Sequence, residues 1–286
     1  MINRLCIIGV GLIGGSLARA LRTAGFCREV VGGGRDPEHL QQAVDLGVID
    51  RFDTDLARAV AGADMVLVAV PLGAMQTVFS KIRDHLEDNA VLTDAGSAKG
   101  SVIEAAIQAF GSVPDRFVPG HPIAGTENSG VAASVPDLYQ NRRVILTPLD
   151  HTATAAVERV RAMWEAAGAE VIEMDAVHHD AVLAATSHLP HMLAFTLVDS
   201  LARLGDREEL FAYAAGGFRD FTRIASSDPV MWRDICLANG DAIQMLIDRY
   251  IEDLQALSRC VHAHDGERLL ELFESAKQVR DAFIDK

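Results

Sequence analysis

Two short motifs place an imidazole and a hydroxyl group in the middle of this chain. Residues 94–100 read Asp-Ala-Gly-Ser-Ala-Lys-Gly, and residues 121–127 read His-Pro-Ile-Ala-Gly-Thr-Glu. A histidine side chain has an ordinary pKa of about 6.5, so its neutral form accepts a proton near pH 7. We expect His121 and Ser97 to lie on loops that follow strands of a nucleotide-binding fold. Such a pair can help remove a hydroxyl proton while a hydride leaves the same carbon, as in an alcohol dehydrogenase.

A glycine motif near the N-terminus predicts where the nucleotide binds. Gly9, Gly11 and Gly14 form Gly-x-Gly-x-x-Gly between an apolar run at residues 5–9 and a helical pattern at residues 13–24. This spacing permits a tight turn, close approach of a pyrophosphate, and close packing of helix on strand. The N-terminus of the helix would then face the phosphates. A glycine-rich turn without a ligand is the alternative.

The end of the second predicted strand departs from the usual NAD pattern. Gly34 stands where a carboxylate is expected to bind the ribose hydroxyls, and Arg35 follows it. A missing carboxylate beside an arginine favours NADP, or the use of both cofactors, because it accommodates a 2′-phosphate. The alternative is that Asp36 binds the ribose of NAD. The cofactor contacts that we expect are Gly9, Gly11, Leu12, Ile13, Gly14, Gly34, Arg35, Val70, Pro71, Asp94 and Ser97.

The order of apolar and amphipathic segments predicts the architecture. Further strands are expected at residues 29–33, 64–70, 90–93, 143–147 and 170–173, and helices at 37–46, 56–61, 101–110 and 153–167. Strands that alternate with helices indicate a parallel sheet with helices on both faces. From residue 176 onward the periodicity is helical, as at residues 180–204 and 231–263.

We therefore expect an α/β Rossmann-type dinucleotide-binding domain at residues 1–175, followed by an all-helical domain at residues 176–286. The helical pattern is too elongated for one short domain to bury its apolar faces. A homodimer built through this second domain would bury them.

The amino-acid composition limits which binding partners and which cellular compartment we expect for the protein. A formal net charge of −14 makes nucleic acid and an anionic membrane poor partners. No stretch is expected to be long and apolar enough to span a membrane. The 4 cysteines are scattered without a Cys-x-x-Cys pair, which is typical of reduced thiols in the cytoplasm. These features predict a cytoplasmic protein that acts on a small molecule.

Six motifs follow one another along the chain. They read Gly9-Val-Gly11-Leu-Ile-Gly14-Gly-Ser, Thr93-Asp94-Ala-Gly-Ser97-Ala-Lys99-Gly, Gly120-His121-Pro-Ile-Ala-Gly-Thr-Glu127, Ser187-His188-Leu-Pro-His191, Gly216-Gly-Phe-x-Asp220-Phe-Thr-Arg223 and Asp228-Pro-x-Met-Trp232. In this order they resemble the prephenate/arogenate (cyclohexadienyl) dehydrogenase family of tyrosine biosynthesis, over nearly the whole chain. The resemblance implies oxidative decarboxylation of prephenate to 4-hydroxyphenylpyruvate, or of arogenate to tyrosine, with NAD(P). We expect neither a fused chorismate mutase nor a C-terminal regulatory domain.

The same resemblance assigns the reacting groups. His121 matches the catalytic base, and Ser97 matches the serine that orients the substrate hydroxyl and the histidine. Ser97 could instead, or in addition, cap the helix that follows it. Arg223 matches the arginine that binds the ring carboxylate, a bidentate task suited to a guanidinium group. Without the motif, Arg223 could equally be a surface residue.

Other assignments concern the walls of the pocket. His191 is implied to bind a substrate carboxylate or side chain, and His188 to line the site. Glu127 and Asp220 match positions that gate the pocket through ionic contacts, although both could be solvated loop carboxylates. Trp232 matches a residue that packs near the pocket, and plain core packing explains it equally well.

Three other functions are less consistent with the sequence. A β-hydroxyacid dehydrogenase or imine reductase would carry a Lys-x-x-x-Asn pair on the interdomain helix, but residues 181–201 contain no lysine. A non-catalytic NAD(P)-binding regulator would not need both His121 and Arg223. A zinc site at the histidines of residues 178–191 lacks the His-Glu-x-x-His or cysteine-rich spacing of known sites. We therefore expect no metal.

Overall fold

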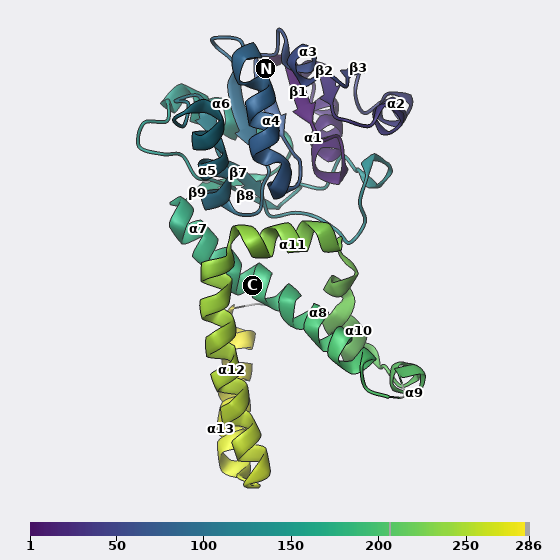
Figure 1. Cartoon of the computed structure of the whole chain (residues 1–286), viewed down its shortest axis with the longest axis vertical. Coiled ribbons are helices and arrows are strands. Elements are labelled where there is room, and N and C mark those ends of the chain that lie inside the picture. Colours follow the sequence, from purple (N-terminus) through teal and green to yellow (C-terminus); the bar gives the residue numbers. More distant parts are fainter. Residues whose placement is uncertain (206, 284–286) are drawn as a thin grey trace. The chain divides into compact units, whose positions relative to one another are not determined.

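The main sheet places the carboxyl ends of its strands at one edge, where the glycine motif lies. The computed structural model describes residues 1–205 and 207–283. Six parallel strands pair in the order β3-β2-β1-β4-β5-β6 (Figure 1). Their bounds are β1 (Ile2–Ile8), β2 (Cys27–Gly33), β3 (Arg51–Asp53), β4 (Met65–Val68), β5 (Val91–Asp94) and β6 (Phe117–Val118). The order reverses between β1 and β4, and dinucleotides bind outside the carboxyl ends of the strands at such a point. The predicted Rossmann-type fold is confirmed.

Helices cover both faces of this sheet. They are α1 (Leu12–Thr23), α2 (Pro37–Asp45), α3 (Leu56–Val60), α4 (Met75–Ile82), α5 (Lys99–Phe110) and α6 (Thr154–Ala166). In β1, Leu5 and Ile7 belong to one apolar cluster, whereas Cys6 and Ile8 belong to the other. Successive side chains of a strand point to opposite faces, so β1 contributes to both layers of the core. This burial on both faces explains why the strand has an uninterrupted apolar sequence.

A second, smaller sheet corrects the predicted position of His121. This sheet contains β7 (Gly120–Pro122), β8 (Arg143–Leu146) and β9 (Glu170–Glu173), and β7 pairs antiparallel with β8. His121 therefore lies within a strand, opposite Ile145, and not on a loop. The expected parallel arrangement holds for the main sheet, whereas β7 and β8 of the second sheet run antiparallel. Pro119 has no N–H group to extend the ladder of β6, so the chain leaves the main sheet there and enters β7.

After β9 the described residues form helices joined by short turns and contain no further strand. The elements are α7 (Ala176–Leu183), a π-helical turn (Ala184–His188), α8 (Leu189–Ala202), α9 (Arg207–Ala212), α10 (Gly216–Thr222), a 3₁₀ turn (Arg223–Ser226), α11 (Pro229–Ala238), α12 (Gly240–His262) and α13 (Gly266–Phe283). Residues 206 and 284–286 of the predicted helical domain lie outside the described residues. Residues 1–240 pack as one compact unit, and residue 241 onward forms a second.

Asn239 divides a segment that the sequence pattern predicts as one helix. The pattern at residues 231–263 is continuous, yet α11 ends at Ala238 and α12 begins at Gly240. Asn239 leaves the helical conformation with φ −120° and ψ 36°, and its side-chain amide donates to the carbonyl oxygen of Asp180 at 2.8 Å. The prediction of one continuous helix here is therefore wrong. The Asn239 side chain makes a tertiary contact that the local apolar periodicity does not reveal.

The segment from α7 to α8 corrects the membrane expectation. Residues Ala176–Ala202 form a continuous helical run of 27 residues, and an 18-residue window within it has a mean hydropathy of 1.4, so the run is long and apolar enough to cross a membrane. The same run carries Asp180 and His179 in hydrogen bonds with the first compact unit's α/β core. Ionisable groups within a membrane-spanning helix are costly, so length and composition alone do not make this run a membrane segment.

Candidate active site

The glycine motif forms a cradle that is open at one position. Gly9 has φ +95°, and a Cβ atom there would lie 2.3 Å from the carbonyl oxygen of Ala69. A Cβ at Gly14 would lie 2.5 Å from the carbonyl oxygen of Gly9, whereas one at Gly11 would meet nothing within 4 Å. Gly11 is also the N-cap residue of α1, which has no side-chain cap and no acidic residue in its first turn. The cradle therefore fits a phosphate group of a dinucleotide.

The end of β2 offers an arginine and leaves position 34 open. A Cβ atom at Gly34 would make only ordinary contacts, the nearest being 3.6 Å from the side chain of Leu40. Arg35 is exposed. One carboxylate oxygen of Asp36 accepts hydrogen bonds from the backbone N–H groups of Glu38 and His39, at 3.0 and 3.2 Å, and thereby caps α2. Asp36 thus already has a structural use, which weakens the alternative that it serves a ribose.

A buried ion pair supports the strand that carries His121. The Lys99 ammonium group donates to the Asp94 carboxylate at 2.6 Å and to the carbonyl oxygen of Gly120 at 2.5 Å. Asp94 also accepts from the N–H groups of Gly96 and Gly120, at 2.7 and 3.1 Å. Both side chains are 0% exposed. Burial lowers the pKa of Lys99, although the charge of Asp94 opposes that shift.

The burial of the Asp94 carboxylate indicates a structural role for this residue and not the cofactor contact that the sequence suggested. We expected Asp94 among the cofactor contacts. Its side chain is fully buried and is committed to Lys99 and two backbone amides. It therefore positions the backbone at the end of β5 and at the start of β7, and it presents no carboxylate surface to a ligand.

His121 begins a chain of buried hydrogen bonds that leads into α7. Its Nδ1 lies 2.9 Å from Nε2 of His179, and Nδ1 of His179 lies 2.8 Å from Oδ1 of Asp180. Burial lowers the pKa of His121 well below 6.5, and the nearby His179, Lys99 and His188 lower it further. His121 is therefore neutral near pH 7 and can accept a proton.

Asp180 also fixes the start of α5. Its two carboxylate oxygens accept from the backbone N–H groups of Lys99 at 2.7 Å and Gly100 at 2.8 Å. Burial would raise the pKa of Asp180, but the hydrogen bonds from His179 and from these two amides hold it below its ordinary value. The cap of α5 thus comes from α7. The suggestion that Ser97 caps this helix is wrong, because Ala98 is the N-cap residue and no side chain of its own caps the helix.

A second cluster of aromatic and imidazole rings forms around Trp232. The rings of His191 and Trp232 stack with centroids 3.7 Å apart, and His188 meets Trp232 edge-on at 6.2 Å. The side-chain amide of Asn239 lies 3.2 Å from Nδ1 of His188. Nε2 of His188 and Nε1 of Trp232 are buried and have no hydrogen-bond partner within the described protein. These atoms are available to a polar ligand.

The histidines of this cluster are also held neutral. Burial lowers the pKa of His188 to about 4, although the charge of Asp180 opposes the shift. Burial likewise lowers the pKa of His191, and the charge of Arg223 adds to the effect. The π-helical turn ends at His188, and Pro190 follows in the first turn of α8. Proline cannot donate an intrahelical hydrogen bond, and a π-helical turn is one way for a helix to accommodate that loss.

An exposed ion pair stands at the other end of the candidate site. The Arg223 guanidinium group donates to the Glu127 carboxylate at 3.2 Å, across 96 residues of sequence. The two side chains are 62% and 40% exposed. Asp220, one turn earlier on α10, is exposed. The structure therefore brings Glu127 and Arg223 together, as ionic gating of a pocket would require.

Sequence reasoning missed several groups that complete this site. Lys99 was noticed only as part of a motif, and His179 only as a zinc candidate. Asp180 and Asn239 received no role. A signal for Asp180 and His179 exists in the adjacent His-His-Asp at residues 178–180. That signal is weak, because their partners lie 58 and 81 residues away in the sequence.

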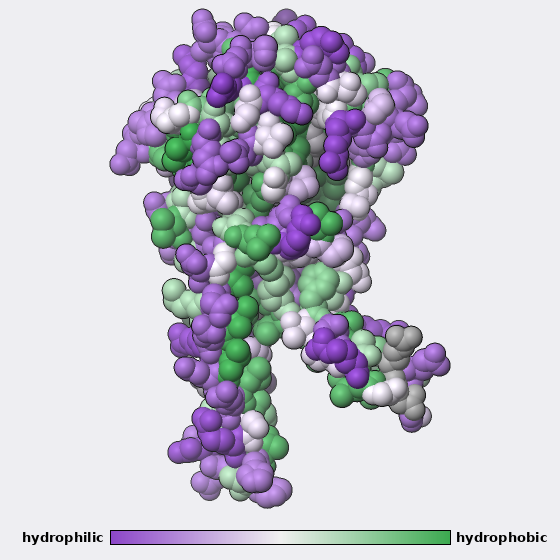
Figure 2. Space-filling view, viewed as in Figure 1, coloured by the Kyte–Doolittle hydropathy of each residue, from purple (hydrophilic) through white to green (hydrophobic). Residues whose placement is uncertain are grey.

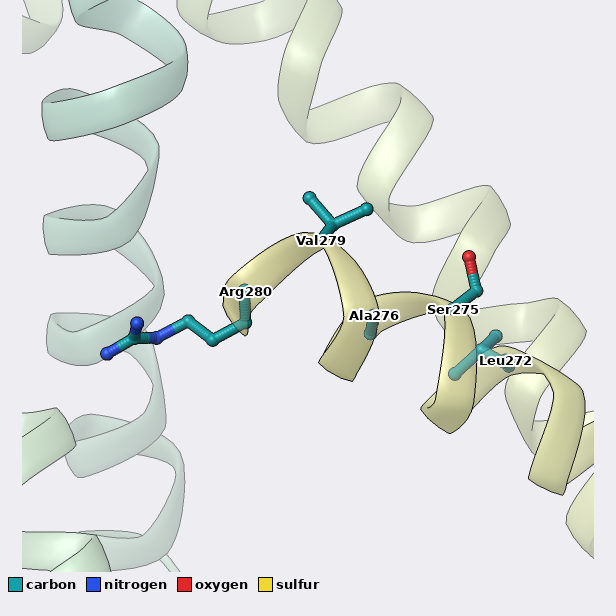
Figure 3. A pocket seen from close by; sticks show the side chains of 5 residues that line it. All are labelled: Leu272, Ser275, Ala276, Val279 and Arg280. Carbon is teal, nitrogen blue, oxygen red and sulfur yellow. The ribbon is translucent and has the colours of Figure 1, made fainter. Parts of the chain in front are cut away.

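A separate hollow of about 660 Å³ lies along α13. It is lined by Leu272, Ser275, Ala276, Val279 and Arg280, which Figure 3 shows on successive turns of this one helix. None of the residues expected to bind the substrate or the cofactor lines it. The five lining residues include no carboxylate, imidazole or thiol, so we do not assign catalysis to this hollow.

Two family descriptions together match most of the chain. The prephenate dehydrogenase nucleotide-binding domain matches residues 17–173, and the prephenate dehydrogenase dimerization domain matches residues 175–275. The curated cyclohexadienyl dehydrogenase of Zymomonas mobilis is 39% identical in an alignment 285 residues long, which covers 97% of this chain and 95% of that protein.

Solved structures agree with these matches. The prephenate dehydrogenase of A. aeolicus, crystallised with hydroxyphenyl propionate and NAD+, superposes with a TM-score of 0.90 at 39% identity, covering 98% of each chain. The arogenate dehydrogenase of Synechocystis gives a TM-score of 0.80 at 27% identity, covering 98% of this chain and 99% of that one.

Proposed function

Because this chain belongs to the prephenate dehydrogenase family, we propose that it oxidatively decarboxylates prephenate to 4-hydroxyphenylpyruvate, arogenate to tyrosine, or both, in tyrosine biosynthesis. The observation that carries the proposal is the position of His121. It is a buried neutral imidazole on β7, tied through Gly120 to the carboxyl end of β5. Since β1 and β5 belong to one parallel sheet, this is the edge at which the glycine cradle opens.

The reaction divides among the groups of this site. His121 accepts the proton of the ring hydroxyl, and the hydrogen on the same carbon leaves as a hydride. NAD(P)+, when bound, supplies the acceptor for that hydride. The ring carboxylate leaves as carbon dioxide, and its bonding electrons complete the aromatic ring. The proton on His121 then returns to the phenolate oxygen, which leaves the imidazole neutral for the next turnover.

Ser97 and Arg223 orient the substrate in this scheme. Ser97 is half-buried between β5 and α5, close in sequence to the Asp94–Lys99 pair, and we assign its hydroxyl to the ring hydroxyl of the substrate. We assign Arg223 to the ring carboxylate. Its present partner, Glu127, is itself a carboxylate, so a substrate carboxylate can replace it on the same guanidinium group. His191 and His188 face the remainder of the substrate.

We further infer that NADP binds at least as well as NAD. Gly34 supplies no carboxylate for ribose hydroxyls, Asp36 caps α2, and Arg35 is exposed beside them. An arginine in this place can bind a 2′-phosphate. Val70 would line the cofactor site, since its side chain would be 3.1 Å from a Cβ atom at Gly9. Pro71, the next residue, is exposed at the end of the loop after β4.

We also propose a homodimer formed through the helical region. Figure 2 shows apolar side chains along α12 and α13, and the most exposed of them include Met245 at 71%, Phe273 at 56% and Phe283 at 74%. Apolar patches of this kind on a protein surface mark interaction sites. The description of residues 175–275 as a dimerization domain supports the same proposal. Light scattering at micromolar concentration should give the mass of two chains, and a monomer would refute it.

We infer a cytoplasmic location for the enzyme. Its 4 cysteines, Cys6, Cys27, Cys236 and Cys260, form no disulfide, which is typical of proteins in a reducing compartment.

Turnover with each acid tests the proposed reaction. Purified protein is mixed with prephenate or arogenate and with NAD+ or NADP+, and formation of reduced cofactor and of carbon dioxide is followed. We expect both products in equal amounts with at least one acid. Folded protein that forms neither product with either acid would contradict the proposal.

A further inference from the structure

Three side chains from two elements form one buried line of hydrogen bonds. It runs from His121 on β7 to His179 and Asp180 on α7, with successive distances of 2.9 and 2.8 Å. The ring of His179 is 0% exposed, and the carboxylate of Asp180 is 14% exposed. The two imidazole rings meet edge-on with centroids 5.1 Å apart. Each nitrogen along this line must therefore have a defined role as donor or acceptor.

The acceptor at the end of the line sets these roles. Asp180 is held ionised by its hydrogen bonds, so it can only accept, and His179 must carry its hydrogen on Nδ1. With its one ring hydrogen directed at Asp180, His179 has a lone pair on Nε2, which accepts the Nδ1–H of His121. His121 consequently keeps its lone pair on Nε2. The nitrogen that does not face α7 is therefore the basic one.

The line has a second consequence during proton transfer. When Nε2 of His121 takes a proton, the ring becomes cationic next to Lys99, whose ammonium group disfavours that charge. His188 also faces the same region and is neutral. Asp180 is the group of opposite charge along the line, and His179 connects it to His121. The Asp180 carboxylate can stabilise a positive charge shared by the two imidazoles, as the carboxylate of a serine protease triad does for one imidazole.

We propose that His179 and Asp180 are positioning residues for the base, which fix the tautomer of His121 and share the positive charge that it gains. The proposal rests on the proposed function for the identity of the substrate, but the tautomer is a property of the free protein. Because Asp180 also caps α5 at Lys99 and Gly100, the same carboxylate links the base to the helix that supports Lys99.

The tautomer can be measured without any substrate. Nitrogen NMR of the imidazole side chains in isotope-labelled protein distinguishes Nδ1–H from Nε2–H rings, and the His121→Asn variant assigns the His121 signals. We expect His121 as the Nδ1–H form in the wild type and a mixture of both forms in His179→Leu. A wild-type His121 with hydrogen on Nε2, or one that is unchanged in His179→Leu, would overturn the proposal.

Kinetics of matched variants test the shared charge. In His179→Gln the amide oxygen can still accept from His121 and the amide nitrogen can donate to Asp180, so orientation is kept. In His179→Leu both bonds are lost. We expect kcat to fall about 10²-fold in His179→Leu with KM within about twofold, and to recover at least about 10-fold in His179→Gln. His178→Leu, at the exposed neighbour on α7, is the control and should keep wild-type kcat.

A purely structural role would give a different pattern. It would lower the melting temperature of both His179 variants and leave kcat of the folded fraction equal to that of His178→Leu, which would overturn the proposal. If His179→Leu does not fold, the test rests on His179→Gln alone. The proposal then requires that His121 has the same tautomer in His179→Gln as in the wild type. Wild-type protein without turnover would contradict the proposed function, whereas the NMR result would still decide the tautomer.

Discussion

His121 and Arg223 belong to the same candidate site but have opposite surroundings. His121 is 9% exposed, lies in a strand, and is connected through hydrogen bonds to His179 and Asp180. Arg223 is 62% exposed, lies in a 3₁₀ turn, and pairs with Glu127 at 3.2 Å. The acid–base end of the site is thus built before a substrate arrives, whereas the carboxylate-binding end can exchange its partner.

This difference follows from what each end has to do. A base works best when its orientation and its protonation state are fixed, which burial and a hydrogen-bond chain achieve. A carboxylate receptor must admit and release a charged group, and an exposed ion pair is cheap to open. Changes at the buried end should therefore affect turnover or stability, and changes at the exposed end should affect substrate binding.

The largest effect is expected from His121→Asn. Asparagine keeps a polar side chain of similar reach but cannot accept the hydroxyl proton, so kcat should fall about 10²-fold to 10⁴-fold with KM little changed. Steady-state kinetics with the active acid measures both constants. His178→Asn on α7 is the control, and a His121→Asn enzyme with its turnover number intact would place the base elsewhere.

Lys99→Met should cost stability rather than binding. The variant leaves Asp94 buried without its cation, and breaking such a pair costs about 3–5 kcal/mol. Denaturant unfolding measures the loss. Arg143→Met removes one partner of an exposed pair with Glu170 and should leave the unfolding free energy nearly unchanged. Equal losses in the two variants would mean that Lys99 does not support the buried end.

Arg223→Ala should raise KM and spare kcat and stability. A charge-assisted contact with a carboxylate is worth about 1.5–3 kcal/mol, which corresponds to an increase in KM of about 10-fold to 100-fold. Arg223→Lys keeps the charge but loses the bidentate geometry, and should fall between the wild type and Arg223→Ala. A change in melting temperature without a change in KM would make Arg223 a structural residue.

The smallest effects are expected at the cofactor loop. Gly34→Asp fits sterically and should favour NAD over NADP, because its carboxylate binds ribose hydroxyls and repels a 2′-phosphate. Arg35→Ala should weaken NADP more than NAD, by about 10-fold. The Michaelis constants for NAD and NADP in the wild type, Gly34→Asp and Arg35→Ala measure this change in cofactor preference. If the wild type strongly prefers NAD and the Arg35→Ala substitution does not change the Michaelis constants, then Asp36 binds the ribose.

The glycine cradle and the strand that carries His121 differ in how well the sequence predicts them. The glycine motif is local, so the spacing of Gly9, Gly11 and Gly14 was enough to predict a cradle at the end of a strand. The strand that carries His121 has only 3 residues and a proline at its end, which is too short for an alternating pattern. Its position depends on pairing with β8, which is a tertiary contact.

The partners of His121 could not be predicted for a related reason. His179 and Asp180 lie on a helix, and their positions in the sequence do not show which strand they will face. Asn239 interrupts a periodic apolar pattern because its side chain binds the backbone of Asp180. The sequence motifs indicated His121 as a candidate base, but its contacts with His179 and Asp180 depend on long-range packing.

The pH dependence of kcat tests most directly whether the base is a buried, preformed neutral histidine. Burial and the neighbouring His179 and Lys99 lower the pKa of His121 well below 6.5, so His121 should stay deprotonated as the pH falls past that value. We expect kcat to remain near its maximum at pH 6.5 and to decline only at lower pH, as His121 gains a proton, with this acid limb absent in His121→Asn. An acid limb centred at or above pH 6.5, or one that persists unchanged in His121→Asn, would contradict the account.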